Sequence, residues 1–252
     1  MSNAFNDRWN YPRWIAHRGA GKLAPENTLA AFRLGASYGY RMFECDAKLS
    51  ADGVLFLLHD DTLERTSNGQ GIAGEQPWAV ISQLDAGSWH SRAWAGEPLP
   101  TLANMIGFCE ANAYLINIEI KPTPGLEHTT GLAVAREARR LWPANAAGAA
   151  PLLTSFQPES LAGAREGADD LPRGLLLDSL WTGWLEAAVS LGCCAIVCHH
   201  RLLDATTVAA VQGAGLRTLS YTVNDEATAQ RLLTLGVDGI ITDAVDRFAP
   251  GA

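Results

Sequence analysis

The chain has 252 residues, and its 27 acidic residues outnumber its 19 lysines and arginines, which gives a net charge of −8. Hydrophobic residues make up 48% and charged residues 18%, a balance that is typical of globular proteins and excludes disordered and collagen-like classes. The acidic balance argues against general binding to nucleic acid or to an anionic membrane surface, because such proteins usually carry a basic surplus.

Short apolar runs alternate with amphipathic stretches along most of the chain. A first strand is predicted at 14–17, followed after a glycine-rich turn by a helix that opens near 27–32 behind polar capping residues. The runs at 42–46 and 54–59 flank the Asp52-Gly53 pair, which predicts a hairpin. Later strands are predicted at 115–120, 152–156, 174–177, 195–198, 216–223 and 239–242. Helical stretches lie between them, among others at 131–142, 184–191, 205–214 and 227–235.

With 54–59 set aside as the hairpin partner, the strand runs have the apolar character of parallel strands buried on both faces. Eight such β/α units in about 250 residues predict an α/β fold, a (β/α)8 TIM barrel. A doubly wound sheet is the alternative, which six or seven strands would favour. The segment 60–100 breaks the rhythm and is interpreted as a small insertion after the second strand region, of the kind that can form a lid. We expect a single domain over residues 1–252 that includes this insertion.

Ionisable residues stand at the predicted strand ends, where barrel enzymes place their reactive groups. Glu44 and Asp46 are two apart on one strand, so their side chains leave the same face, and Glu119 on the third strand is a natural third carboxylate. Carboxylates in one space repel one another unless a cation lies between them. This favours a hard divalent ion, Mg²⁺ or Ca²⁺, over zinc. The alternative is a group of buried acids that Lys48 and Lys121 neutralise without a metal.

Two histidines follow predicted strands near these carboxylates. His17 and His59 are candidate proton carriers, because imidazole both gives and takes protons near neutral pH. Structural hydrogen bonding is the alternative for each of them. Arg18 could hold phosphate oxygens with its forked guanidinium and Lys121 with its point charge. Salt bridges to the acids are the alternative for both cations.

These charged residues belong to short motifs spread along the chain. The motifs are His17-Arg18-Gly19 with Pro25-Glu26-Asn27-Thr28, Glu44-Cys45-Asp46, His59-Asp60-Asp61 with Leu63-Glu64-Arg65-Thr66, the run 117–122, Tyr221-Thr222-Val223-Asn224, and the run 236–243. Together they resemble the glycerophosphodiester phosphodiesterase family, over about residues 12–246. The resemblance is greatest to the small cytosolic bacterial enzymes that act with glycerol-phosphate uptake systems.

The resemblance implies a role for particular side chains. The metal ligands would be Glu44, Asp46 and Glu119, the general acid-base pair would be His17 and His59, and the substrate- and phosphate-binding residues would be Arg18, Lys121, Tyr221 and Asn224. The implied cofactor is one divalent cation, Mg²⁺ in the first place and Ca²⁺ as the alternative. The family often has tryptophan where this chain has Tyr221, so an aromatic wall is kept while its N–H is replaced by a hydroxyl.

The implied activity is metal-dependent hydrolysis of glycerophosphodiesters, such as glycerophosphocholine and glycerophosphoethanolamine, to sn-glycerol 3-phosphate and an alcohol. One alternative is a lyase similar to phospholipase D on the same barrel, which stops at a cyclic phosphate. Another is an inactive barrel that only binds polyol phosphates. The first nucleophile, water or the glycerol 2-hydroxyl, stays open at this level, as does the division of roles between the two histidines.

The place of the protein in the cell is also predicted. No run reaches the roughly 18 apolar residues of a membrane span, and the first ten residues lack the apolar core of a secretory signal. The five cysteines are too sparse for a disulfide scaffold and fit a reducing compartment. We therefore expect a cytoplasmic protein whose partner is a small-molecule substrate, without nucleic-acid or membrane partners. The oligomeric state stays open, with a homodimer as one option.

Overall fold

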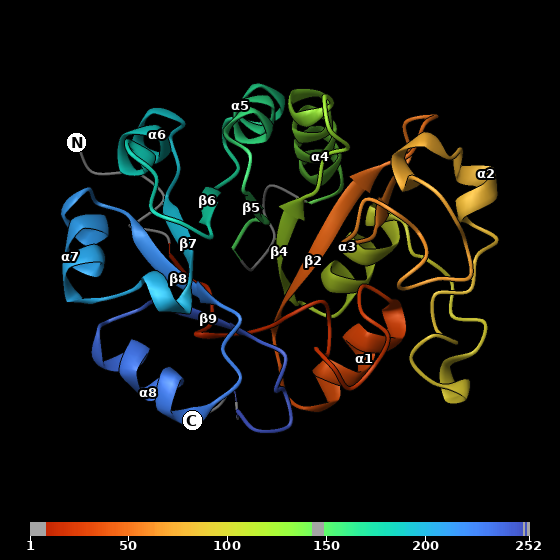
Figure 1. Cartoon of the computed structure of the whole chain (residues 1–252), viewed down its shortest axis with the longest axis horizontal. Helices are drawn as coiled ribbons and strands as arrows, with labels where there is room; N and C mark the ends of the chain where they lie inside the picture. Colours follow the sequence, from red (N-terminus) through yellow and green to blue (C-terminus); the bar gives the residue numbers. More distant parts are fainter. Residues whose placement is uncertain (1–8, 143–148, 249, 251–252) are drawn as a thin grey trace.

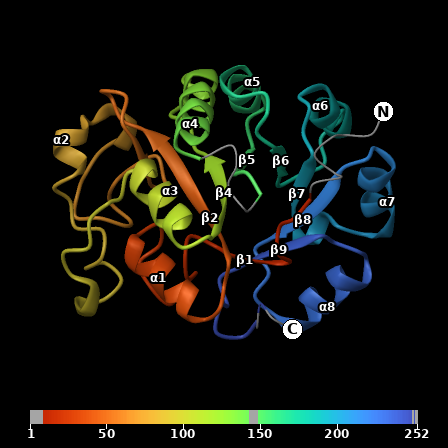
Figure 2. The same ribbon diagram turned by 180° about the vertical axis from the view of Figure 1, so that it is seen from behind.

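The computed structural model describes residues 9–142, 149–248 and 250. Within these residues, eight parallel strands close into a barrel, and the helices that connect them lie outside the ring of strands (Figures 1 and 2). The strands of the ring are β1 (Trp14–Ala16), β2 (Met42–Leu49), β4 (Leu115–Ile120), β5 (Leu152–Ser155), β6 (Arg173–Leu177), β7 (Ala195–His199), β8 (Arg217–Tyr221) and β9 (Gly239–Thr242). The connecting helices are α1 (Leu29–Ser37), α3 (Leu102–Ala111), α4 (Glu127–Leu141), α5 (Pro158–Gly167), α6 (Trp184–Ser190), α7 (Ala205–Gly213) and α8 (Glu226–Thr234).

Strand β1 closes the ring. It pairs in parallel with β9 on one side and with β2 on the other, where Ala16 is opposite Phe43. The sheet of the ring therefore has no open edge, as a doubly wound sheet would have. The predicted (β/α)8 barrel is confirmed, and the doubly wound alternative is wrong.

Alternation along β2 separates two hydrophobic layers. Phe43 and Cys45 point outward and join the cluster that the strands form with the surrounding helices, including Phe32 and Met105. Met42 points into the barrel, where it shares a second cluster with apolar side chains from the other strands, Ile15, Leu152, Leu176, Val197, Leu219 and Ile241. Glu44 and Asp46 have the same parity as Met42. The interior of the barrel is thus apolar at the start of the strands and charged further along them.

A hairpin brings the chain back to these charged residues. Strand β3 (Leu55–Leu57) pairs antiparallel with the end of β2, with Leu49 opposite Leu55 and Ala47 opposite Leu57. The next amide, of Leu58, donates to the carbonyl of Asp46 over 3.1 Å. Because β2 continues beyond Asp46 and β3 folds back along it, His59 returns to the level of the carboxylates.

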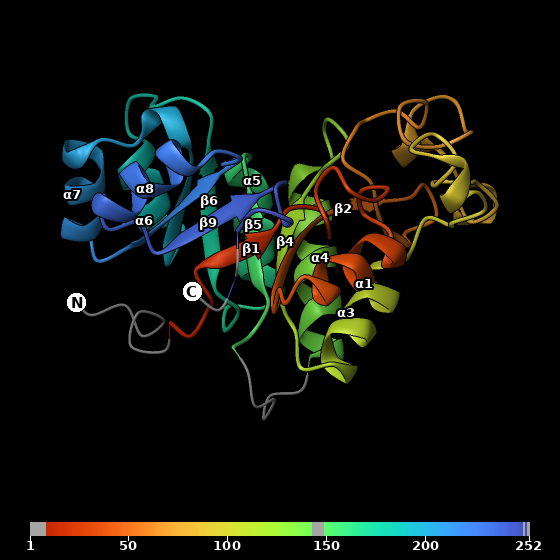
Figure 3. The same ribbon diagram turned by 90° about the horizontal axis from the view of Figure 1, so that it is seen from below.

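The segment after the hairpin, residues 58–101, is called the excursion here. It holds the short helix α2 (Trp78–Ile81) and two 3-10 turns, Ala73–Glu75 and Arg92–Trp94, and it projects from the side of the barrel beside α1 (Figure 3). The excursion has a small buried core of its own, which includes Leu63, Ile81 and Leu99 and continues onto Phe56 of β3. It corresponds to the predicted insertion and forms a packed unit.

No helix in the described residues has the length and apolar character that crossing a bilayer requires.

Candidate active site

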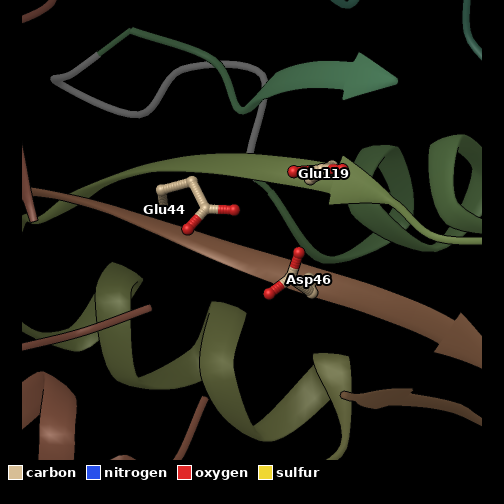
Figure 4. A group of neighbouring side chains, drawn as sticks. All are labelled: Glu44, Asp46 and Glu119. Atoms are coloured by element: carbon tan, nitrogen blue, oxygen red, sulfur yellow. The ribbon is translucent and has the colours of Figure 1, made fainter. Parts of the chain in front are cut away.

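Three carboxylates from β2 and β4 meet inside the barrel, toward the carboxyl ends of the two strands (Figure 4). The parallel pairing of β2 with β4 sets Asp46 directly opposite Glu119, while Glu44 lies one pleat earlier on the same face. All three side chains are buried, and one oxygen of each lies within 4.8 Å of the others. The predicted cluster of acids is therefore formed by strand register alone.

The charges of this cluster are not balanced within the described residues. Burial raises the pKa of Glu44 well above its usual value, and repulsion from Asp46 and Glu119 adds to this rise. Burial and repulsion from Asp46 raise the pKa of Glu119 to about 7, although Lys121 opposes the rise. Burial also tends to raise the pKa of Asp46, but the charges of Arg18 and Lys121 outweigh it, and the pKa falls below its usual value.

Glu44 Oε1 and Asp46 Oδ1 are buried without a hydrogen-bond partner among the described residues, and the third such oxygen, Glu119 Oε1, lies 2.5 Å from the Lys121 ammonium. Buried anionic oxygens of this kind are costly unless a cation or a proton meets them. Hard oxygen donors that converge from two strands fit a divalent cation. Of the two lysines of the metal-free alternative, Lys121 pairs with Asp46 and Glu119, whereas the Lys48 ammonium donates to Asp61 over 3.1 Å.

The loop between β1 and α1 closes over the cluster. Arg18 and Asn27 both have positive φ, 49° and 59°, a left-handed backbone conformation that residues other than glycine seldom adopt. This bend lets the backbone N–H of Arg18 donate to Glu44 Oε2 over 3.0 Å. The Asn27 side chain donates to Asp46 Oδ2 over 2.8 Å and accepts from the Asp46 backbone N–H over 3.1 Å. The left-handed backbone at these two positions thus allows the loop to orient two of the three acids, Glu44 and Asp46.

The two predicted phosphate-binding cations lie at this cluster. Arg18 Nε is 3.1 Å from Asp46 Oδ2, and Nη1 donates to Glu26 over 2.8 Å. Lys121 Nζ is 2.5 Å from Glu119 Oε1 and 3.8 Å from Asp46 Oδ1. Lys121 therefore forms the alternative salt bridge to Glu119, whereas the Arg18 guanidinium pairs with Asp46 and Glu26 and not with Glu44 or Glu119. Among the described residues, no acid pairs with Arg18 Nη2, so this group and the other Lys121 protons can still donate to a ligand.

His17 is held by an acid from the other end of the chain. Its Nδ1 is 2.6 Å from Asp243 Oδ1, across 226 positions of sequence, and its Nε2 is 3.8 Å from Glu44 Oε2. Burial tends to raise the pKa of Asp243, but the hydrogen bonds from His17 and Asn224 keep it below its usual value. The Asp243 carboxylate at Nδ1 fixes the orientation of the ring, so that Nε2 faces the cluster of carboxylates.

Asn224 and Gly21 set the position of Asp243. The Asn224 amide donates to Asp243 Oδ2 over 3.0 Å and accepts from its backbone N–H over 2.8 Å. A Cβ on Gly21 would lie 2.2 Å from Asp243 Cα, so only glycine allows this approach of the β1–α1 loop. The structure places the predicted substrate-binding residue Asn224 directly behind the His17–Asp243 pair.

His59 has a similar arrangement with its neighbour in sequence. Its Nδ1 is 2.7 Å from Asp60 Oδ1. Burial lowers the pKa of His59, and the nearby charges of Arg18 and Lys121 lower it further against the opposing effect of Asp46. The shift favours the neutral form of the ring, and the contact of Nδ1 with Asp60 directs Nε2 away from that aspartate.

A cleft of about 210 Å³ adjoins the carboxylates, with Glu119, Lys121, Phe156 and Gln157 among its lining residues. The Lys121 ammonium lies 5.4 Å from the centroid of the Phe156 ring. The Tyr221 ring packs edge-on against Phe156 with centroids 5.8 Å apart. Tyr221 is thus beside this cleft, and its hydroxyl donates to the carbonyl of Leu177 over 3.0 Å.

The structure adds residues to which the sequence patterns assign no role. Glu26 accepts a hydrogen bond from Arg18 and Asn27 donates one to Asp46. Asp243 contacts Nδ1 of His17, and Asp60 contacts Nδ1 of His59. The signal available for Asp243 was its place at the end of the last strand, and for Asp60 its place directly after a candidate catalytic histidine.

Comparison with known proteins agrees with this arrangement. The model of the glycerophosphoryl diester phosphodiesterase family matches residues 17–247. The glycerophosphodiester phosphodiesterase of Caldanaerobacter subterraneus subsp. tengcongensis is 32% identical over 91% of this chain and 93% of its own length. The Bacillus subtilis glycerophosphodiester phosphodiesterase is 30% identical over 93% of this chain and 84% of its own length.

Two solved structures are similar in fold and sequence. An Oleispira antarctica phosphodiesterase in complex with the product sn-glycerol 3-phosphate superposes with a TM-score of 0.87 and 34% identity, and 94% of each chain is covered. A glycerophosphodiester phosphodiesterase from Agrobacterium tumefaciens gives a TM-score of 0.80 and 29% identity over 95% of this chain and 99% of its own. This chain is an enzyme that belongs to the glycerophosphoryl diester phosphodiesterase family.

Proposed function

We propose that the protein hydrolyses glycerophosphodiesters, such as glycerophosphocholine and glycerophosphoethanolamine, to sn-glycerol 3-phosphate and the free alcohol. The observation that carries the proposal is the convergence of three carboxylates, Glu44, Asp46 and Glu119, beside two histidines. Nδ1 of each histidine lies within hydrogen-bond distance of an aspartate. The product bound in the Oleispira antarctica relative supports the substrate class.

The carboxylates would hold one divalent cation, Mg²⁺ in the first place and Ca²⁺ as the alternative. Such an ion, when bound, supplies positive charge that withdraws electron density from the phosphate as phosphorus is attacked. Arg18 Nη2 and the Lys121 ammonium offer donors to the phosphate oxygens, in addition to the acids they already contact. The cations and the bound metal together offset the acids, so that a phosphate anion is attracted to a site on an acidic protein.

His17 and His59 move the protons. The Nε2 of one histidine takes the proton of the attacking hydroxyl as the new P–O bond forms. The other histidine enters the step protonated on Nε2 and gives that proton to the departing alcohol oxygen as its P–O bond breaks. If the attacking hydroxyl is that of water, the monoester forms directly; if it is the glycerol 2-hydroxyl, a cyclic phosphate forms first, and water then opens it in a second step in which the two histidines exchange roles. Asp243 and Asp60 keep the two rings in the orientation and tautomer that these transfers need. Phe156 lines the cleft beside Lys121, where the substrate would extend, and Tyr221 supports the Phe156 ring from the side.

The test is the release of sn-glycerol 3-phosphate from glycerophosphocholine, measured with a coupled assay before and after treatment with EDTA. We expect release that EDTA abolishes and that added Mg²⁺ or Ca²⁺ restores. His17→Ala should lower kcat by about 10²- to 10⁴-fold, the usual contribution of a general acid or base. Absence of metal-restored release from the wild-type protein would overturn the proposal.

The same experiment separates the alternatives. A lyase similar to phospholipase D accumulates a cyclic phosphate, which ³¹P NMR of the reaction detects in place of the monoester. An inactive barrel binds sn-glycerol 3-phosphate in calorimetry without any turnover.

The five cysteines are all buried and form no disulfide with one another in the described part of the chain. This supports the further proposal that the enzyme works in the reducing cytoplasm.

A further inference from the structure

The excursion contacts the β1–α1 loop and the start of α1 at separate points. His90 Nε2 is 3.0 Å from the carbonyl of Lys22, and Glu97 accepts a hydrogen bond from the backbone N–H of Ala30 over 3.0 Å. The third contact, made by Arg65, differs from these two, because both of its partners touch side chains of the candidate active site.

Arg65 lies between two carboxylates and uses both edges of its guanidinium. Nε and Nη2 donate to Asp60 over 2.5 and 2.9 Å, and Nη1 and Nη2 donate to Glu26 over 2.9 and 2.8 Å. A guanidinium that bonds two carboxylates in this forked way fixes the direction of each as well as its distance. Lysine has no equivalent geometry.

Each of these carboxylates holds a candidate catalytic or phosphate-binding group with its other contacts. Asp60 Oδ1 is 2.7 Å from His59 Nδ1, and Glu26 Oε1 accepts from Arg18 Nη1 over 2.8 Å. A chain of hydrogen bonds therefore runs from the His59 ring through Asp60, Arg65 and Glu26 to Arg18. The chain of hydrogen bonds joins a candidate proton carrier at the start of the excursion, His59, to a candidate phosphate-binding residue of the β1–α1 loop, Arg18.

We propose that Arg65 is a positioning residue that sets the His59 imidazole and the Arg18 guanidinium at the same time. This inference rests on the function proposed above. Arg65 does not touch the substrate; it acts through Asp60 on proton transfer and through Glu26 on phosphate binding. Removing it therefore affects kcat through the first path and KM through the second.

A purely structural role for Arg65 would predict that its removal lowers the unfolding temperature of the protein, which the structure does not favour. The side chain is 44% exposed, and ion pairs at such positions contribute little to stability. The excursion also keeps its contacts through His90 and Glu97 and its own buried core. We therefore expect variants of Arg65 to stay folded, with an unfolding temperature close to that of the wild type.

The first experiment compares Arg65→Gln and Arg65→Lys with the wild type on glycerophosphocholine in excess Mg²⁺. We expect Arg65→Gln to lower kcat by about 10- to 100-fold, as loss of a residue that orients a catalytic group usually does, and to raise KM. Arg65→Lys should recover only part of either loss, because it keeps the charge without the fork. The control is Arg139→Gln, which removes a surface guanidinium of similar exposure, 39%, paired with Asp170, and should leave both constants unchanged.

The second experiment is a pair of double-mutant cycles. If Arg65 acts through Asp60, Asp60→Asn combined with Arg65→Gln loses no more kcat than the worse single variant. If it acts through Glu26, the same holds for KM when Glu26→Gln is combined with Arg65→Gln. Independent, multiplying losses in both cycles would overturn the inference.

Wild-type kcat and KM in a folded Arg65→Gln protein would also overturn it, and would leave the proposed function intact. If the wild-type protein itself releases no sn-glycerol 3-phosphate, the proposed function fails, and the role of Arg65 fails with it.

Discussion

The acidic side chains of the site divide into two groups with opposite electrostatics. Burial and mutual repulsion raise the pKa values of Glu44 and Glu119 above the usual range. Asp60 and Asp243 show the reverse, because hydrogen bonds from Arg65 and His17 lower their pKa values against the effect of burial. A nearby cation would therefore favour the ionised form of the first group. The second group is ionised already and can hold a histidine ring.

The Asp243–His17 contact gives a prediction at this scale. Asp243→Asn keeps the size of the side chain but removes the charge that fixes the His17 tautomer. We expect kcat on glycerophosphocholine to fall by about 10- to 100-fold with KM little changed. Asp170→Asn, the same substitution at a surface ion pair, is the control and should have no effect. An Asp243→Asn enzyme that keeps its full kcat would show that Asp243 does not orient His17.

Short-range sequence patterns reach only part of this site. Glu44 and Asp46 were predictable as a pair because strand alternation fixes which face they share, and the barrel then brings Glu119 beside them. The partner of His17 lies 226 positions away, and the partner of Arg65 in the β1–α1 loop lies 39 positions away. Nothing in local spacing encodes such pairs, since they depend on the closure of the barrel and on the course of the excursion.

At the scale of elements, strands were easier to locate than helices. The runs 115–120 and 239–242 coincide with β4 and β9, because a strand buried on both faces is a continuous apolar run. The apolar pattern does not locate α3 or α5. Helix α3, Leu102–Ala111, is apolar over most of its surface, and α5, Pro158–Gly167, packs with small residues at Gly163 and Ala164. Helix α4 begins at Glu127, ahead of the predicted 131, without a side-chain cap to mark the start.

The excursion shows the same limit more strongly. Its place between strand and helix was predictable from the break in rhythm, but its irregular turns have no period that would indicate a packed core. The structure shows buried Leu63 and Ile81 and backbone hydrogen bonds from Leu63, Ala73 and Ala86 to other parts of the segment. This favours a fixed support for His59 and Arg18 over the predicted lid.

Hydrogen exchange tests this difference. A fixed support predicts that the amides of Leu63, Ala73 and Ala86 are protected in the free enzyme and that saturating sn-glycerol 3-phosphate changes their protection little. A lid predicts fast exchange in the free enzyme that slows by an order of magnitude or more with the ligand. Peptides from α8 on the far side of the barrel serve as the internal control in the same mass-spectrometry experiment.

For the whole molecule, the barrel encloses three carboxylates, and only two cations, Arg18 and Lys121, pair with them among the described residues. The closed ring of strands keeps Glu44, Asp46 and Glu119 together whether or not a cation is present, since their positions follow from strand register. Without a cation, the fold must therefore either hold protons on these acids or accept their repulsion. Binding of the proposed metal would therefore be linked to stability through the same residues.

This linkage predicts how pH affects the metal-free protein. The pKa of Glu119 is about 7 in the folded state and near 4.5 in the unfolded chain. Between these values the folded state binds a proton that the unfolded state has released, so the free energy of unfolding falls as pH rises through this window. The stabilisation that Glu119 contributes is fully present below about pH 4.5 and is lost above about pH 7. The free energy of unfolding changes by up to about 3 kcal/mol over this window.

A bound divalent cation favours the ionised acids, so its stabilising effect should run the other way. We expect Mg²⁺ at about 100 times its Kd at pH 8 to raise the Tm by about 5–10 °C near pH 8. The same concentration should raise the Tm by much less near pH 5, where protons compete for the same oxygens and weaken Mg²⁺ binding. Differential scanning calorimetry with and without Mg²⁺ at the two pH values measures the difference. Glu119→Gln, which keeps the shape but cannot ionise, should show a weaker Mg²⁺ effect with a smaller dependence on pH, because Glu44 still titrates. Equal increases in Tm at both pH values in the wild type would mean that the ion binds away from this cluster.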